Sequence, residues 1–118
     1  MNRLFTFIAT ALIFCAGNQT KVKAETMDKE IKLVQDWDKT FPKSEKVKHE
    51  KVTFKTQYGL TLAADLYIPK NAEGKLPAIA VSGPFGAVKE QCSGLYAQTM
   101  AERGFITIAF DPSFTGES

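Results

Sequence analysis

Histidine and cysteine are scarce in this sequence, which has one histidine and two cysteines among its 118 residues. No serine or cysteine lies in a G-x-S-x-G or G-x-C-x-G pattern, so the chain shows no nucleophile elbow. Nucleophilic catalysis needs an activated nucleophile, a base within hydrogen-bond reach and a third group that orients the base. We therefore assign no catalytic residue in this sequence.

Signatures of phosphate, nucleic-acid and metal sites are also lacking. The glycine-containing stretch at residues 82–86 is not followed by Gly-Lys-Ser/Thr and does not have G-x-G-x-x-G spacing, which excludes the usual phosphate loops. No basic stripe with interleaved aromatic residues is present, so we do not expect nucleic acid as a partner. We expect no cofactor and no metal.

The first 24 residues have the three parts of a secretory signal peptide. Arg3 supplies a basic start, residues 4–16 are a mainly apolar run of thirteen residues, and Val22 and Ala24 are small residues at the −3 and −1 positions of a cleavage site. The run is shorter than the roughly 20 residues of a membrane-spanning helix. We expect cleavage after Ala24 and a secreted or periplasmic protein with no stable membrane anchor; an uncleaved anchor or a buried helix is the alternative.

Cleavage would change both the charge and the cysteine count. The formal net charge of the whole chain is +2, but without the three basic residues of the signal peptide the chain has 12 basic and 13 acidic residues. Only Cys92 would remain, so no internal disulfide could form. A single free cysteine is more often a small buried apolar residue than a nucleophile, and we expect Cys92 to be structural.

Residues 25–49 are expected to form an amino-terminal helix and a connector. Ile31, Val34 and Trp37 recur at three-residue spacing, which predicts a helix over residues 25–39. The charged residues 43–51 indicate an exposed connector. His49 lies in it, and we expect a solvent-exposed side chain rather than a catalytic base.

The remainder, residues 50–118, has the pattern of an α/β domain. Residues 51–56 and 60–68 are rich in β-formers and are separated by a short turn containing Gly59, which predicts a hairpin. An apolar strand at 76–81, a helix at 89–103 and an apolar strand at 105–110 follow, which predicts a parallel strand–helix–strand crossover. Gly104 is expected to end the helix.

The loop between the first crossover strand and the helix is the candidate binding segment. It consists of Ser82, Gly83, Pro84, Phe85 and Gly86. Ligands bind at the carboxyl ends of strands in open α/β sheets, and glycines let the backbone approach a ligand closely. By its spacing alone, the loop is more typical of an ordinary turn between a strand and a helix.

Five short stretches of the sequence, in this order and spacing, resemble the dienelactone-hydrolase-like branch of the α/β hydrolases, which is close to the X-Pro dipeptidyl-peptidase-type enzymes. They are residues 82–91, 94–97, 101–105, 109–113 and 116–118. The likeness extends back through residues 61–69 to about Trp37. It implies the amino-terminal part of an α/β-hydrolase fold, with residues 50–118 as a truncated domain.

The resemblance also implies an activity. In the family a serine or cysteine nucleophile, an acid and a histidine hydrolyse an ester or related acyl bond, and all three come later in the chain. We therefore expect a fragment of a secreted hydrolase of small-molecule acyl substrates that is inactive alone. The alternative is a non-catalytic secreted protein that binds small molecules or is vestigial.

By the same resemblance, the loop from Ser82 to Gly86 would supply one backbone donor of the oxyanion hole. Ser82 stands where the family usually has a histidine. Pro84 has no N–H to donate, so the Phe85 amide is the next candidate donor. Asp111 would shape the turn after the last strand rather than act as the triad acid. Lys89 and Glu90 are expected in a solvated first turn of the helix.

Overall fold

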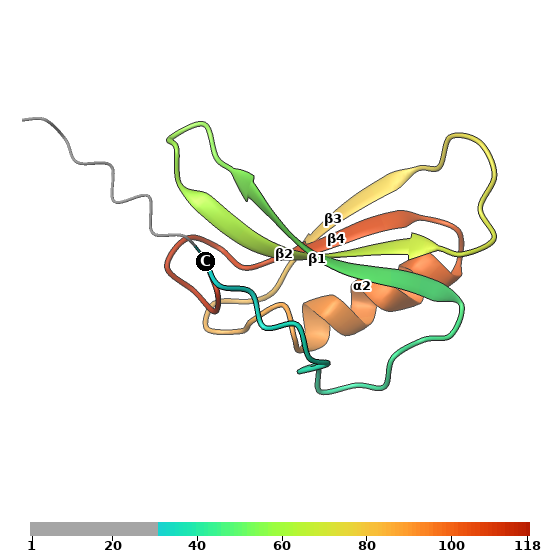
Figure 1. The fold of residues 1–118 in the computed structure, drawn as a ribbon, viewed down its shortest axis with the longest axis horizontal. Helices are drawn as coiled ribbons and strands as arrows, with labels where there is room; N and C mark the ends of the chain where they lie inside the picture. Colours follow the sequence, from blue (N-terminus) through green and yellow to red (C-terminus); the bar gives the residue numbers. More distant parts are fainter. Residues whose placement is uncertain (1–30) are drawn as a thin grey trace, which may run out of the picture.

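The computed structural model describes residues 31–118 as one mixed sheet with one helix (Figure 1). In chain order the elements are β1 (Val47–Lys55), β2 (Thr61–Pro69), β3 (Ala78–Ser82), α2 (Cys92–Glu102) and β4 (Ile106–Phe110). The expected signal peptide and the first part of the expected helix lie outside the described residues. Between residues 31 and 118, no helix is both long and apolar enough to cross a membrane.

The predicted hairpin is confirmed. β1 pairs with β2 in antiparallel register from Val47 opposite Pro69 to Lys55 opposite Thr61. Gly59, with a φ of 80°, occupies the left-handed conformation at the turn that glycine adopts without steric cost. The expected exposed connector at residues 43–51 is wrong over its second half, because β1 begins at Val47, whose side chain is buried.

The predicted crossover is also confirmed. β3 and β4 pair in parallel, β4 pairs with β2 in antiparallel fashion, and the order across the sheet is β1-β2-β4-β3. β3 is therefore an edge strand among the described residues. The arrangement is a mixed α/β sheet, compatible with part of an α/β fold.

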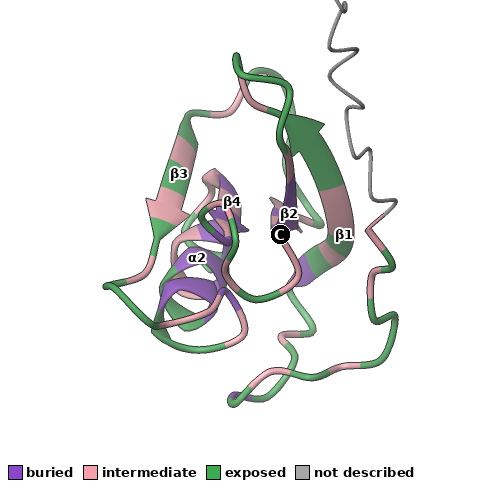
Figure 2. Cartoon of the chain, turned by 90° about the vertical axis from the view of Figure 1, so that its left-hand side faces the viewer, coloured by how far each residue is buried: buried purple, intermediate pink, exposed green. Residues whose placement is uncertain are grey.

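The helix covers one face of this sheet. The core cluster consists of Val47, Tyr67, Ala97, Ala101 and Ala109, and Figure 2 shows buried residues gathered on α2 and the strands that face it. The opposite face carries half-buried apolar side chains, among them those of β4, and no described helix lies on it. Residues on β4 thus alternate between a helix-covered face and an open one.

α2 is shorter at its start than predicted. It begins at Cys92 rather than near residue 89, because the residues just before it form turns. Its end agrees with the prediction. Gly104 has a φ of 100°, its N–H donates to the Ala101 carbonyl at 3.0 Å, and Phe105 N–H donates to the Met100 carbonyl at 3.3 Å. These two bonds form a Schellman cap.

The predicted helix is wrong over residues 31–39, which have no regular secondary structure. Two of their polar groups bond to residues outside this segment instead. Val34 N–H donates to Glu117 Oε1 at 2.8 Å, and Trp37 Nε1 donates to the Phe41 carbonyl at 2.8 Å. The apolar spacing is real, but tertiary contacts override a weak helical preference.

Candidate functional site

The loop from Ser82 to Gly86 leaves the carboxyl end of β3 and leads toward α2 (Figure 1). Gly86 has a φ of 82°, and Ala87 N–H closes a turn on the Pro84 carbonyl at 3.0 Å. The Phe85 ring is fully exposed. Within residues 31–118 the Phe85 N–H has no acceptor, so this backbone donor is free.

The segment after β4, residues 111–118, lies beside this loop because β3 and β4 are paired in register, with Ser82 opposite Phe110. Asp111 begins it and is fully buried. Asp111 Oδ1 accepts the Lys89 backbone N–H at 2.8 Å, and Oδ2 accepts the Glu117 N–H at 3.1 Å. These bonds agree with the turn-shaping role expected of Asp111.

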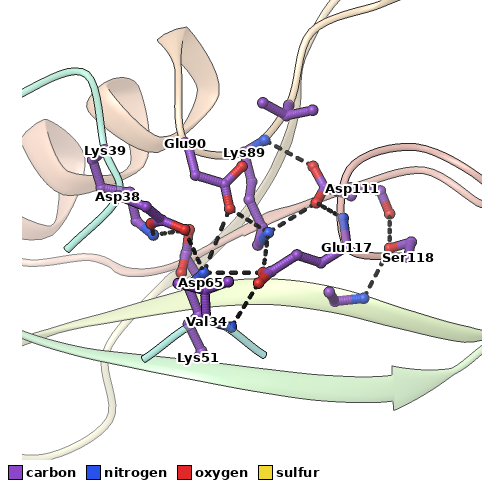
Figure 3. A network of polar contacts seen from close by, with 12 residues as sticks. Val34, Asp38, Lys39, Lys51, Asp65, Lys89, Glu90, Asp111, Glu117 and Ser118 are labelled. Carbon is purple, nitrogen blue, oxygen red and sulfur yellow. Dashed lines mark hydrogen bonds and ion pairs between the residues drawn. The ribbon is translucent and has the colours of Figure 1, made fainter. Parts of the chain in front are cut away.

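Lys89 is the buried cation between the two segments (Figure 3). Its ammonium group donates to Glu90 Oε1 at 2.5 Å, Asp111 Oδ2 at 2.8 Å and Glu117 Oε2 at 2.6 Å. An ammonium has three N–H donors, and each finds a carboxylate oxygen here. The expectation that Lys89 and Glu90 form a solvated turn is therefore wrong.

The surroundings of Lys89 also set its charge state. Burial on its own lowers the pKa of Lys89, but hydrogen bonds from Asp111, Glu117 and Glu90 outweigh burial and raise that pKa above its usual value. Lys89 is therefore charged at any pH at which the protein is handled. The geometry is that of a structural cation and not of a proton donor or base.

Lys51 extends the network from β1 to the amino-terminal segment. Its ammonium lies 2.8 Å from Asp38 Oδ2, 3.0 Å from Glu117 Oε2 and 3.6 Å from Glu90 Oε1. Figure 3 shows Glu117 in the middle, between Lys51 and Lys89. One set of ion pairs thus joins the segment before β1, the strand itself, the turn before α2 and the segment after β4.

His49 belongs to a neighbouring cluster on the same face of the sheet. Its Nε2 lies 2.7 Å from Asp65 Oδ1, and the Lys39 ammonium lies 3.0 Å from Asp65 Oδ2. The His49 ring also contacts Trp37 and Tyr67. The expectation of a solvent-exposed His49 is wrong: 14% of its side chain is exposed, because strand pairing places it opposite the buried Tyr67 and within 2.7 Å of the Asp65 carboxylate.

The structure does not bring His49 to the loop. His49 lies on β1 and the loop leaves β3, and these strands form opposite edges of the sheet. Cys92, expected to be buried, is exposed at the start of α2. Between residues 31 and 118, no group of three or more potential ligands has the arrangement of a metal site.

Sequence reasoning missed Lys89 and Glu117 as organising residues. Both are charged residues next to glycine-containing turns, which is the ordinary pattern of a solvated surface. Lys89 and Glu117 are 28 residues apart in the chain, so no local spacing indicates the ion pair between them. Of the residues expected in the oxyanion loop, Ser82 is the last residue of β3, and Gly83, Phe85 and Gly86 follow it in the loop.

We expect the network to make stability depend on acid pH. Burial on its own raises the pKa of Asp38, but hydrogen bonds from Lys39 and Lys51 lower that pKa to about 2. The pKa of Glu117 is also lowered, because the hydrogen bond from Lys89 outweighs burial. At acid pH the unfolded chain therefore binds protons more readily than the folded one. The two carboxylates contribute their full stabilisation above about pH 4.5, and the unfolding free energy falls as the pH approaches 2.

Urea unfolding measured from pH 7 to pH 2 tests this expectation. Asp38→Asn should reduce the decrease in unfolding free energy between neutral and acid pH, whereas Glu73→Gln, at an exposed turn residue, should not. An equally steep decrease in all three proteins would contradict the assignment.

Comparison with known proteins extends this picture. No family model matches the chain. The uncharacterized protein PA2218 of Pseudomonas aeruginosa is 62% identical over an alignment of 118 positions, which covers 94% of this chain and 32% of PA2218. The uncharacterized protein YcjY of Escherichia coli is 46% identical over 61 residues, covering 50% of this chain and 20% of YcjY. The chain therefore spans about a third or less of the length of these relatives.

Solved structures agree with the sequence comparison. The crystal structure of PA2218 matches with a TM-score of 0.73 and 72% identity, over 75% of this chain and 28% of that one. DcsB, solved in complex with its substrate analogue, matches with a TM-score of 0.53 and 31% identity, over 59% of this chain and 23% of that one. Brefeldin A esterase, a bacterial homologue of human hormone-sensitive lipase, matches at 15% identity with a TM-score of 0.49, too low to carry an argument. The described sheet and helix are thus similar to one part of larger proteins.

Proposed function

We propose that this chain supplies the oxyanion loop of an α/β hydrolase of the dienelactone-hydrolase-like branch, acting on ester or related acyl bonds of small molecules. The observation that carries the proposal is the free Phe85 N–H in a turn at the carboxyl end of β3, within a parallel strand–helix–strand unit. Donors of this kind stabilise the negative charge that develops on the carbonyl oxygen during acyl transfer. An oxyanion-hole donor must be a fixed backbone N–H that is not hydrogen-bonded to another group of the protein.

The loop chemistry supports Phe85 over its neighbour as the donor. Pro84 has no N–H, and its carbonyl accepts the Ala87 N–H, which closes the turn around Phe85. Gly86 takes the left-handed conformation that lets the chain turn here. The exposed Phe85 ring leaves the backbone on this side open to a substrate.

The nucleophile, acid and base of the proposed reaction are assigned to sequence that the larger relatives have beyond the matched region. His49 does not serve as the base in this proposal, because its Nε2 is already held by Asp65. The likeness to DcsB, a protein solved with its substrate analogue, supports a substrate-binding protein. We also propose export, with cleavage after Ala24 giving a secreted or periplasmic product.

A chimera tests the proposed function. The part of PA2218 that this chain matches is replaced by residues 37–118, and PA2218, the chimera and the 118-residue chain are assayed with p-nitrophenyl acetate and a fluorophosphonate probe. We expect PA2218 and the chimera to hydrolyse the ester and the chain alone to give only background, because catalysis needs the missing nucleophile and base.

Each of the other outcomes has a defined meaning. If PA2218 and the chimera are both inert toward ester and probe, the non-catalytic alternative, a small-molecule-binding protein, replaces the proposal. If PA2218 is active and the chimera folds but is inert, the loop of this chain does not function as an oxyanion loop.

A further inference from the structure

Lys89 and Asp111 are joined by two separate hydrogen bonds, one from the backbone and one from the side chain of the lysine. The Lys89 N–H donates to Asp111 Oδ1 and the Lys89 ammonium donates to Oδ2, both at 2.8 Å. Both side chains have 0% exposure. Two charge-assisted bonds between the same buried residues fix their relative orientation as well as their distance. We call this pair the Lys89–Asp111 clamp.

The clamp holds one end of the loop, and the sheet holds the other. Ser82 enters the loop as the last residue of β3 and is paired opposite Phe110 on β4. Asp111 follows Phe110 directly, so the clamp fastens Lys89 to the same end of β4. The segment between Ser82 and Lys89 is therefore held at both of its ends beside the carboxyl end of β4.

Little else holds the loop within the described residues. The backbone bonds between its two ends are the turn bond from Ala87 N–H to the Pro84 carbonyl, a bond from Gln91 N–H to the Val88 carbonyl at 3.1 Å, and a long one, 3.4 Å, from Val88 N–H to Gln91 Oε1. The Phe85 side chain is fully exposed and so does not anchor the loop by packing. A loop with few contacts of its own takes its position from its fixed ends.

From this geometry we infer that Lys89 and Asp111 are positioning residues that set the place of the Phe85 amide. The inference rests on the proposed function for its catalytic meaning, but the clamp itself is a property of the described structure. A donor to an oxyanion acts only when it is already in place, since reorganisation during the reaction removes its advantage. A buried ion pair at the loop's exit provides that fixed position.

The chain offers a charge-neutral way to break the clamp. A methyl group added at Gly116 would lie 2.3 Å from Asp111 Oδ2, which forces the carboxylate to move. A methyl group at Gly74 would meet nothing within 4 Å, although Gly74 has a similar left-handed φ of 75° compared with 56° at Gly116. Gly116→Ala and Gly74→Ala both place an alanine in the left-handed region, and only the first displaces Asp111.

Amide hydrogen exchange measured by NMR on the full 118-residue chain tests the inference. In Gly116→Ala we expect the Lys89 and Ala87 amides to exchange about tenfold faster or more, relative to amides in the middle of β2. Gly74→Ala should leave that ratio unchanged. Asp111→Asn, which weakens the clamp from the other side while the Lys89 ammonium keeps Glu90 and Glu117 as partners, should speed Ala87 exchange in the same way, and it provides the result if Gly116→Ala does not fold.

Two results would overturn the inference. One is faster exchange of Lys89 with an unchanged Ala87 amide, since the loop would then keep its place without the clamp. The other is equal acceleration in β2 and the loop, which indicates a general loss of stability. Because exchange does not depend on turnover, failure of the proposed hydrolase activity leaves this test intact. In an active chimera, Gly116→Ala should lower kcat with KM unchanged.

Discussion

Replacing Phe85 by proline in the PA2218 chimera should lower kcat about 100- to 1,000-fold, the usual effect of removing one oxyanion donor, while KM changes little. Proline removes the N–H and nothing else that the proposed transition state uses. The proline ring fixes a backbone angle common in turns, so the loop can accept it beside Pro84. Steady-state kinetics with p-nitrophenyl acetate measure both constants.

The matched control is Phe85→Ala, which removes the exposed ring and keeps the N–H. We expect its kcat to stay close to that of the unmodified chimera. If proline and alanine lower kcat equally, the side chain and not the amide is responsible. If neither variant changes kcat, the donor lies elsewhere and the assignment of Phe85 is wrong.

Replacing Lys89 by methionine should reduce the unfolding free energy of the chain by about 3–5 kcal/mol, the usual cost of removing one partner from a buried ion pair. The stability would be lost because the Lys89 ammonium donates hydrogen bonds to three carboxylates, those of Glu90, Asp111 and Glu117, and Asp111 is fully buried. Without the ammonium, their charges remain in a poorly solvated site with no compensation. Urea unfolding at neutral pH measures the difference.

Lys75→Met is the control, because Lys75 is exposed in the turn before β3. Exposed substitutions of this kind usually change stability by less than about 0.5 kcal/mol. Similar losses in the two variants would show that methionine itself, rather than the broken ion pairs, destabilises the chain. An unaltered stability in Lys89→Met would contradict the buried network.

The parts of the fold that depend on local pattern could be predicted from the sequence. Alternation of polar and apolar residues on either side of Gly59 predicts the β1–β2 hairpin, and two apolar strands around a helix predict the β3–α2–β4 crossover. Gly104 predicts the end of α2 because only the helix's own carbonyls are involved in that cap. In each case neighbours in sequence determine the structure.

The parts that depend on distant partners could not be predicted. The spacing of Ile31, Val34 and Trp37 is helical, yet the Val34 amide bonds to Glu117, which lies 83 residues away. His49 is in a run of charged residues, and only the pairing of β1 with β2, which places His49 opposite Tyr67, brings its ring within 2.7 Å of the Asp65 carboxylate.

The candidate site shows the same division. Its glycines and Pro84 predict a turn at the end of a strand, but the local sequence does not predict what holds that turn in place. The clamp that holds the loop involves residues 22 positions apart, and the sequence around each of them is ordinary surface sequence. A buried lysine is the exception among lysines, so composition alone argues against it.

The long sequence separations in the ion-pair network also bear on the order in which the protein folds. Contacts between residues 66 and 83 positions apart close large loops, and the chain entropy lost in doing so is recovered only once the strands between them have assembled. The hairpin is local and can form early, whereas Glu117 can meet Lys51 and Val34 only after β4 has docked on β2. Interactions that form after the folding transition state slow unfolding and leave the folding rate nearly unchanged. We therefore expect the network to act mainly on the lifetime of the native state.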